Sequence, residues 1–423
     1  MSTHPVSNLD AIQPTHPHAS TGPLIHPFKS LKAPIFTTTL HEFVDTADLC
    51  RFKELEKTGH VEGEFEYGRY GNPTVRTCEQ RLAHLDRGQD AVFFPSGMNA
   101  ITTTLAALLK GHKDAHIIFG SEGYRRTRQF VADYLPHIDI TTLEMADFGH
   151  IERYLKPTTK IVFFELPTNP YLKIVDVEKV AKKLPQDVIL VVDHTFATPI
   201  NHRPLEWGAH LVVPSTTKYI AGHNDALGGA VIGRADLCEK VRQARGIFGG
   251  MPTAHSAYAT LNGLDDLELK MERQNATGLA VAQLLENNPK IDRVWYPGLK
   301  SHPDHETAKK LFTGHGGVVS FEVKGGLNDA SLFVDRFLHH CGGFAHIGPS
   351  FGGSETLIEQ PSLISFYELT TEQRLAVGIK DNLIRLSVGV ARTDVVLASI
   401  KSALDDLYRG FPGPEREIGH IDW

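Results

Sequence analysis

The feature that most limits how this chain can fold is a series of short apolar runs that alternate with helical stretches. The runs are rich in β-branched and aromatic residues and read AVFF at 91, AHIIF at 115, KIVFFEL at 160, VILVVD at 188 and HLVVP at 210. Continuous apolar strands joined by crossover helices are typical of a mostly parallel sheet covered on both faces. We therefore predict an α/β fold whose ligands bind at the carboxyl ends of the strands.

A length of 423 residues is more than one hydrophobic core comfortably fills. Residues 1–62, rich in Pro, Thr, His and Ser with one short helical pattern, are expected to form an extended arm. The large α/β domain is expected over 63–275. A long helical pattern at 254–287 then leads into a smaller α+β domain, expected over 276–423. Within it, the glycine-rich segment 339–361 is expected to be a loop.

Composition excludes several classes of protein. The chain has 43 basic and 50 acidic residues, a net charge of −7, and no basic block, which argues against nucleic acid or a membrane as partner. Its four cysteines are far apart and form no Cys-x-x-Cys pair, so neither disulfides nor a thiolate zinc site is expected. No signal peptide and no apolar run of about 20 residues is found, and a cytoplasmic location is expected.

Histidine is frequent, with 23 copies, but its close pairs lack further ligands. The pairs His16/His18 and His339/His340 are not joined by other metal-binding side chains at suitable spacing. We therefore expect no metal site.

Asp193 closes the apolar run VILVVD and is followed by His194 and Thr195. A carboxylate at the end of a buried strand is costly to desolvate unless a cation or hydrogen-bond donors contact it. Taken alone, Asp193 is also compatible with a helix cap or a structural ion pair. Its position predicts a positively charged partner at the carboxyl edge of the sheet.

Lys218 follows the next apolar run, again at a carboxyl end. Burial favours the neutral amine, the form that attacks carbonyl groups, so Lys218 is placed as an imine-forming lysine would be. Ser215 and Thr217, just before it, offer hydroxyl donors to an anion such as phosphate. A surface lysine is the alternative for Lys218 alone, but the pairing with Asp193 on a neighbouring strand argues against it.

The run AVFF ends in Pro95, Ser96, Gly97 and Met98 and then enters a helix. Small residues at a strand-to-helix turn let backbone N–H groups face an anion, and the helix dipole favours negative charge there. Because many parallel-sheet proteins turn with Ser-Gly, this motif alone indicates a phosphate site only weakly.

Together these strand ends offer an anion cradle, an amine and a buried acid. Pyridoxal phosphate requires all three, for its phosphate, its aldehyde and its pyridine nitrogen. Tyr124, just after the run AHIIF, is placed to stack on the pyridine ring, although a core tyrosine is the alternative. The sequence therefore predicts a pyridoxal phosphate site.

Seven motifs then occur in order: YGRYGNPT (67–74), PSGMNA (95–100), ELPTNP (165–170), VVDHTFATP (191–199), STTKYIAGHND (215–225), FGGSETLIEQP (351–361) and IRLSVGV (384–390). Through them the chain resembles, from about residue 33 to 409, the Cys/Met-metabolism branch of fold-type-I pyridoxal phosphate enzymes. That group contains cystathionine γ-synthase, cystathionine γ-lyase and O-acylhomoserine sulfhydrylase. The resemblance implies a large sheet of the seven-stranded type.

The resemblance also implies a role for each matching residue. Lys218 corresponds to the Schiff-base lysine, Asp193 to the pyridinium partner and Tyr124 to the stacking tyrosine, which is also discussed as a proton-transfer group. The remaining cofactor-binding positions it implies are Gly97, Met98, Thr195, Ser215 and Thr217.

Two further sets of residues follow from the resemblance. Tyr67 and Arg69 correspond to residues that reach the cofactor phosphate of a neighbouring subunit, which implies a dimer with shared sites and a tetramer of two such dimers. In such an assembly the arm of residues 1–62 is expected to contact a neighbouring subunit. Arg385 corresponds to the arginine that binds the substrate α-carboxylate, assisted by Ser350 and Asn169. Glu355 corresponds to a glutamate at the mouth of the site that suits a distal cationic group, although a solvated loop acid is its alternative.

The chain also departs from the family pattern. Relatives usually have Asn where this chain has His194, and Cys-Tyr-Gly-Gly where it has Gly123, Tyr124, Arg125 and Arg126. The missing thiol makes a methionine γ-lyase less expected. The roles of His194, Arg125 and Arg126 stay open.

The expected function is γ-elimination or γ-replacement on a homoserine-derived amino acid. Both reactions share one path, so the sequence does not separate them. The alternatives are a γ-lyase acting on an oxygen- or nitrogen-linked amino acid such as canavanine, an O-acylhomoserine sulfhydrylase, and an inactive binding protein on the same fold. The presence of Lys218 and Asp193 argues against the last.

Overall fold

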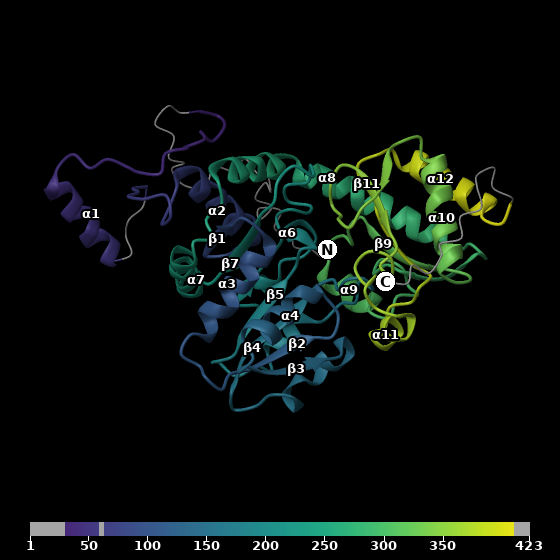
Figure 1. The fold of residues 1–423 in the computed structure, drawn as a ribbon, viewed down its shortest axis with the longest axis horizontal. Coiled ribbons are helices and arrows are strands. Elements are labelled where there is room, and N and C mark those ends of the chain that lie inside the picture. Colours follow the sequence, from purple (N-terminus) through teal and green to yellow (C-terminus); the bar gives the residue numbers. More distant parts are fainter. Residues whose placement is uncertain (1–29, 59–62, 410–423) are drawn as a thin grey trace, which may run out of the picture.

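A computed structural model describes residues 30–58 and 63–409 of the chain, in two sheet-containing domains joined by a long helix (Figure 1). Half of the expected arm, and with it the pair His16/His18, lies outside the described residues. No helix in the described part is long and apolar enough to cross a membrane.

The large domain is built on a seven-stranded sheet in the order β1-β7-β6-β5-β4-β2-β3. Only β7 runs antiparallel to its neighbours, so the sheet is mostly parallel, as predicted. The strands are β1 (Asp90–Phe94), β2 (His116–Gly120), β3 (Asp139–Leu143), β4 (Thr159–Glu165), β5 (Ile189–Asp193), β6 (Leu211–Val212) and β7 (Gly229–Gly233).

Alternate residues of the central strands pack into two separate cores. Phe94 and Val191 face one core, whereas their neighbours Phe93 and Val192 face the other. The first core is covered by α3 (Gly97–Leu109), α4 (Arg125–Tyr134) and α7 (Ala235–Phe248). The second is covered by α2 (Pro73–Asp86), η1 (Met145–Arg153), α5 (Val177–Ala181) and α8 (Ala254–Glu286). Burial on both faces explains why the central strands are continuous apolar runs.

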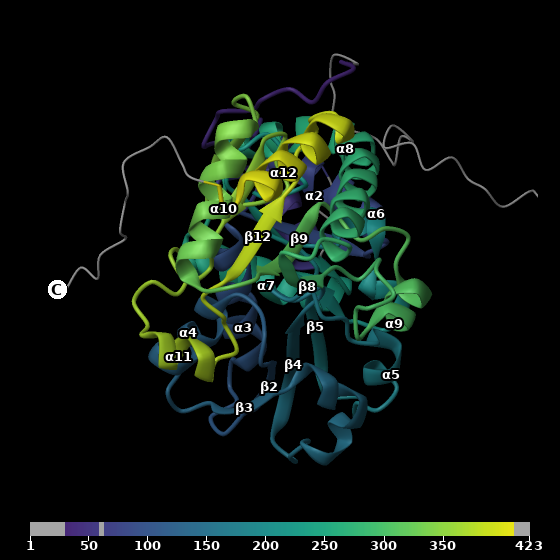
Figure 2. The same cartoon turned by 90° about the vertical axis from the view of Figure 1, so that its right-hand side faces the viewer.

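The smaller domain contains a five-stranded sheet in the order β10-β11-β12-β9-β8, antiparallel except between β10 and β11. Its strands are β8 (Ile291–Trp295), β9 (Val318–Val323), β10 (Ala345–Ile347), β11 (Thr356–Glu359) and β12 (Leu383–Ser387). Helices α10 (Leu327–His340) and α12 (Thr393–Asp406) lie over this sheet beside α8 (Figure 2). Because α8 runs without a break through residue 275, the expected domain boundary falls inside a helix that serves both domains.

The expectation of a loop throughout 339–361 is wrong, because β10 and β11 lie within it. These strands have only three and four residues, too few for an alternating pattern to stand out among the surrounding glycines. Their pairing depends on β12, which follows later in the chain. The short elements that remain are α6 (Thr198–Asn201), η2 (Pro204–Trp207), α9 (His305–Leu311) and α11 (Thr371–Ala376).

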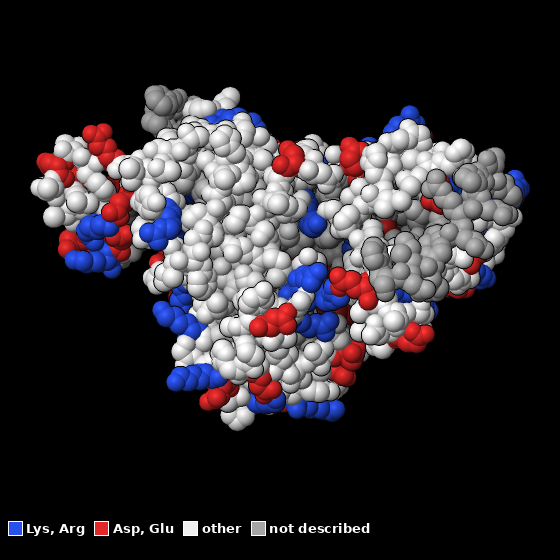
Figure 3. All heavy atoms as spheres, viewed as in Figure 1, with Lys and Arg blue, Asp and Glu red and all other residues white. Residues whose placement is uncertain are grey.

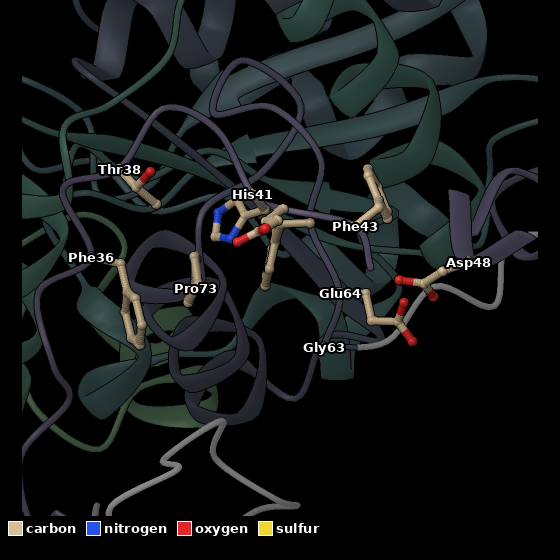
Figure 4. Close-up of a pocket in the computed structure, with 10 residues that line it drawn as sticks. Phe36, Thr38, His41, Phe43, Asp48, Gly63, Glu64 and Pro73 are labelled. Carbon is tan, nitrogen blue, oxygen red and sulfur yellow. The ribbon is translucent and has the colours of Figure 1, made fainter. Parts of the chain in front are cut away.

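The described part of the arm extends away from the large domain and carries α1 (Thr46–Thr58) at its far end (Figure 1). It is joined to the body by a bridge between Leu40 and Tyr67. Arm residues such as Phe36, His41 and Glu64 line an open cavity of about 330 Å³ (Figure 4). The cavity is therefore a feature of the arm and not of the sheet edge at which ligands are expected.

Candidate active site

Asp193, the last residue of β5, is 6% exposed and is held by Thr195. Its Oδ1 accepts hydrogen bonds from the Thr195 N–H (3.0 Å) and the Thr195 hydroxyl (2.5 Å). The same hydroxyl oxygen accepts from the Ser215 N–H at 2.8 Å, which ties the end of β5 to the segment after β6. Burial raises the pKa of Asp193, and the Thr195 hydrogen bonds partly oppose that rise.

Lys218 lies where the two domains meet. Its Nζ donates to the Ser350 hydroxyl at 2.8 Å and lies 5.2 Å from the centre of the Phe351 ring. Burial and the nearby Arg385 guanidinium lower the pKa of Lys218 to about 8, against a smaller opposing effect of Glu359. A substantial share of this amine is therefore neutral near pH 8, as a nucleophile requires.

The turn between β1 and α3 packs closely against Ser215. A Cβ atom on Gly97 would lie 2.8 Å from the Ser215 Cβ, so this approach requires glycine. Ser96 caps α3 by accepting from the Asn99 N–H at 3.1 Å. The Gly97 and Met98 N–H groups lie in the first turn of α3, where N–H groups have no acceptor within the helix. Thr217 instead uses its hydroxyl within the chain, donating to the Gly228 carbonyl oxygen at 3.1 Å.

These groups fit pyridoxal phosphate. Lys218 supplies a partly neutral amine for the aldehyde, and the turn at Gly97 supplies N–H groups for the phosphate. The buried Asp193 carboxyl group forms no ion pair with any residue that the structure describes, so no described cation is paired with it. A protonated pyridine nitrogen would supply that cation.

Tyr124 lies between β2 and α4 and is 51% exposed, so the alternative of a core tyrosine is wrong. Its backbone N–H donates to Glu165 Oε2 at 2.9 Å. Gly123, before it, adopts a φ of 141°, a conformation that side-chain-bearing residues rarely take. The tyrosine ring is thus carried by a loop that is anchored through its backbone.

The small domain supplies a buried arginine cluster. Arg385 is 4% exposed, donates from Nη1 to Asn169 Oδ1 (3.0 Å) and forms an ion pair from Nη2 to Glu359 Oε1 (2.8 Å). A longer hydrogen bond of 3.4 Å joins Nη2 to the Ser350 carbonyl oxygen. The structure thus brings the three residues expected at the substrate carboxylate into one group, next to Lys218.

Two carboxyl groups of the 351–361 motif differ sharply. Glu355 is exposed and lies in the turn before β11, whereas Glu359 is 2% exposed and paired with Arg385. Burial raises the pKa of Glu359, and Arg385 and Lys218 oppose that rise. Of these two groups, Glu359 is the one whose charge acts on the Lys218 amine.

Tyr67 and Arg69 lie on the large domain near the C-terminal end of α7. Arg69 donates to the Gly246 carbonyl oxygen at 3.1 Å, and its guanidinium lies 4.8 Å from the centre of the Tyr70 ring. Their described contacts are with this surface and not with the Asp193 and Lys218 group.

Four residues at or behind this site were not singled out from the sequence: Asp86, Glu165, Phe351 and Glu359. Glu165 ends an apolar strand just as Asp193 does, so the same reasoning would have found it. Asp86, fully buried, is hydrogen-bonded at 2.9 Å to His194, which faces away from Asp193 on the opposite side of β5. Glu359 depends on the pairing of β11 with β12 and leaves no local signal.

A mostly parallel sheet with an amine and an acid at its carboxyl edge, closed by a smaller α+β domain, is how fold-type-I pyridoxal phosphate enzymes are built. The chain is of this class. It belongs to the family described as Cys/Met metabolism PLP-dependent enzymes, whose profile matches residues 20–405.

Comparison with individual relatives supports the same family assignment. The chain is 40% identical over 380 residues to cystathionine γ-synthase 1, chloroplastic, of Arabidopsis thaliana, covering 89% of this chain and 65% of the relative. It is 35% identical to an L-methionine γ-lyase of Fusobacterium nucleatum, covering 92% and 97%. A solved cystathionine γ-synthase of Xanthomonas oryzae in complex with cystathionine superposes with a TM-score of 0.81 at 30% identity, covering 90% and 94%.

Proposed function

We propose that this enzyme catalyses γ-elimination or γ-replacement on a homoserine-derived amino acid, as cystathionine γ-synthases and γ-lyases do. The observation that carries the proposal is Ser350, which joins the two reactive groups. Its hydroxyl accepts from Lys218 and its carbonyl oxygen accepts from Arg385. A substrate whose α-carboxylate binds Arg385 therefore has its α-carbon within reach of the Lys218 amine.

Each residue has a distinct task in this proposal. Bound pyridoxal phosphate supplies an electron sink for negative charge that develops on the substrate. Arg385 binds the α-carboxylate in a two-pronged contact, with Asn169 fixing the guanidinium plane. Lys218 would hold the cofactor aldehyde. Once freed by the substrate amine, its Nζ would take the α-proton, give that proton up again, and then take the β-proton before the γ-substituent leaves. Asp193 would keep the pyridine nitrogen protonated.

A dimer with shared sites is part of the proposal. Arg69 contacts Gly246 near the end of α7, where Ile247 and Phe248 have exposed apolar side chains, and the arm projects from the same side of the large domain (Figure 1). In the same view, the face of the large domain next to the arm carries few charged side chains (Figure 3). Such a surface suits a second copy of the chain. Arg69 would contact the phosphate of the cofactor bound to that second copy, and two such dimers would form a tetramer. We also propose a cytoplasmic location.

A substrate panel tests the reaction. Purified enzyme is given O-acylhomoserines with and without cysteine or sulfide, then cystathionine, methionine and canavanine, and scored for 2-oxo acid, homoserine and thioether products. Thioether from an O-acylhomoserine identifies γ-replacement, and 2-oxobutanoate from cystathionine identifies γ-elimination. Turnover of none of these compounds, with the cofactor bound, would contradict the proposal.

A further inference from the structure

Glu165 and Asp193 end two neighbouring parallel strands and are register partners. Glu165 closes β4, Asp193 closes β5, and their Cα atoms are directly paired. Side chains of paired residues in adjacent strands point to the same face of the sheet. The two carboxyl groups, 5% and 6% exposed, therefore lie side by side at the carboxyl edge.

The surroundings of the two carboxyl groups differ. Asp193 accepts two hydrogen bonds from Thr195 on one oxygen. Glu165 accepts one, from the Tyr124 N–H to Oε2 at 2.9 Å, and its Oε1 is buried without a partner. The close fit of the loop is set by Gly123, where a Cβ atom would lie 3.3 Å from Glu165 Oε2.

No described cation pairs with either carboxyl group. The charged groups that face Glu165 are Asp193 and Glu122, which disfavour a negative charge there, and Arg385, whose guanidinium is already paired with Glu359. Two adjacent buried carboxyl groups cannot both be ionised at moderate cost. Burial and the charge of Asp193 both raise the pKa of Glu165 well above its usual value. One of the two carboxyl groups therefore stays protonated, and we assign the proton to Glu165.

We propose that Glu165 is a positioning residue that works as a neutral acid, anchoring the Tyr124 loop through Oε2 and leaving the single negative charge of the pair on Asp193. This inference rests on the proposed role of Asp193 and Tyr124 toward the cofactor. A neutral Glu165 adds no second negative charge beside Asp193, whereas an ionised one would compete with Asp193 for the pyridine nitrogen. Glu165 touches neither substrate nor reacting atoms in this account.

Glu165→Gln and Glu165→Ala separate the neutral acid from an ionised one. The glutamine side chain keeps an acceptor for the Tyr124 N–H and a hydrogen-bond donor in place of the acid O–H, but it carries no charge. We expect the cofactor dissociation constant of Glu165→Gln, measured by titrating apoenzyme with pyridoxal phosphate, to stay within about threefold of wild type. For Glu165→Ala we expect it to rise about tenfold or more, because a buried donor loses its partner. The matched control is Glu144→Gln, an exposed carboxylate that accepts from the Ser121 hydroxyl at 3.0 Å, with no expected change.

The protonation state is read directly by infrared spectroscopy. The wild-type enzyme should show a carboxylic-acid carbonyl band at neutral pH that Glu165→Gln lacks and Glu144→Gln retains. A band missing from wild type, a glutamine variant as weak in cofactor binding as the alanine variant, or an alanine variant that binds like wild type would each overturn the inference. Neither the cofactor titration nor the infrared spectrum requires a substrate. Both can therefore be interpreted even if the enzyme does not catalyse the proposed reaction.

Discussion

The two walls of the site are built in different ways. The large-domain wall takes Asp193 from the last position of a parallel strand, and Gly97 and Lys218 from the segments that follow β1 and β6. The small-domain wall takes Glu359 and Arg385 from an antiparallel pair, in which two distant segments must align to place one charge opposite the other. Parallel strand ends therefore fix the cofactor side, and strand register fixes the substrate side.

Two hydrogen bonds link the candidate site residues of the two domains. Lys218 to Ser350 and Arg385 to Asn169 both cross from one domain to the other. Changes in the large-domain wall should therefore alter cofactor binding and colour, whereas changes in the small-domain wall should alter substrate affinity and leave the cofactor in place.

The largest expected effect is that of Lys218→Ala. Loss of the group that holds the aldehyde and moves the proton should lower kcat by about a thousandfold or more. The visible absorbance band that borohydride bleaches should also disappear, while the thermal unfolding midpoint of the apoenzyme stays close to wild type. Normal turnover with a reducible band in this variant would assign the role to another residue.

Next comes His194→Ala, behind the large-domain wall. Both members of the His194 and Asp86 pair are fully buried, so removal of the histidine leaves a carboxyl group without its partner. We expect the free energy of unfolding to fall by about 3–5 kcal/mol, as is usual when a buried pair is broken. Denaturant unfolding measures this change, and a loss below 1 kcal/mol would show that the pair adds little.

Arg385→Lys changes the small-domain wall while keeping its charge. A lysine cannot make the two-pronged contact with a carboxylate. The KM should rise about ten- to a hundredfold, as for a lost charged hydrogen bond of about 1.5–3 kcal/mol. The absorbance of the bound cofactor should not change, and a bleached spectrum would contradict the separation of the two walls.

Subunit mixing tests whether the large-domain wall is completed by a second chain. Arg69→Ala and Lys218→Ala chains are each expected to be inactive, and random exchange gives mixed dimers in which one of two sites is intact. About a quarter of wild-type activity should return if sites are shared across a two-fold axis. No recovery after exchange verified by mass spectrometry would place Arg69 outside the partner's site.

The smallest effect is expected for Glu355→Ala, because this side chain is exposed. A contact of an exposed carboxylate with a distal cation on the substrate is worth about 0–1 kcal/mol, so KM should rise by no more than about fivefold. The rise should occur for cystathionine or canavanine and not for O-acetylhomoserine, which lacks a distal cation. Equal changes for both kinds of substrate would remove Glu355 from substrate selection.

The same contrast explains what the sequence could predict. The mostly parallel sheet and its candidate residues were predictable because a strand buried on both faces is a continuous apolar run. Asp193 ends one such run, and Lys218 follows the next run after a few residues. The edge strand β3 was missed because its sequence, DITTL, is half polar and only partly buried.

For the small-domain wall, fewer strands and site residues could be predicted from the sequence. The strands β10 and β11 are too short to show a period, and the partnership of Glu359 with Arg385 exists only after β11 has paired with β12. The resemblance of the motifs indicated Arg385 and Glu355. A motif does not show which of its side chains are buried, and in the structure Glu359 is buried whereas Glu355 is exposed.

The central claim is that Lys218 holds the cofactor opposite Asp193, and peptide mapping tests it most directly. The wild-type holoenzyme is reduced with borohydride, digested and examined by mass spectrometry for the lysine that carries the pyridoxyl group. The account predicts the modification on the peptide that contains Lys218 and on no other peptide in substantial yield. Modification of a different lysine, or an unmodified Lys218 in enzyme that has lost its colour on reduction, would contradict it.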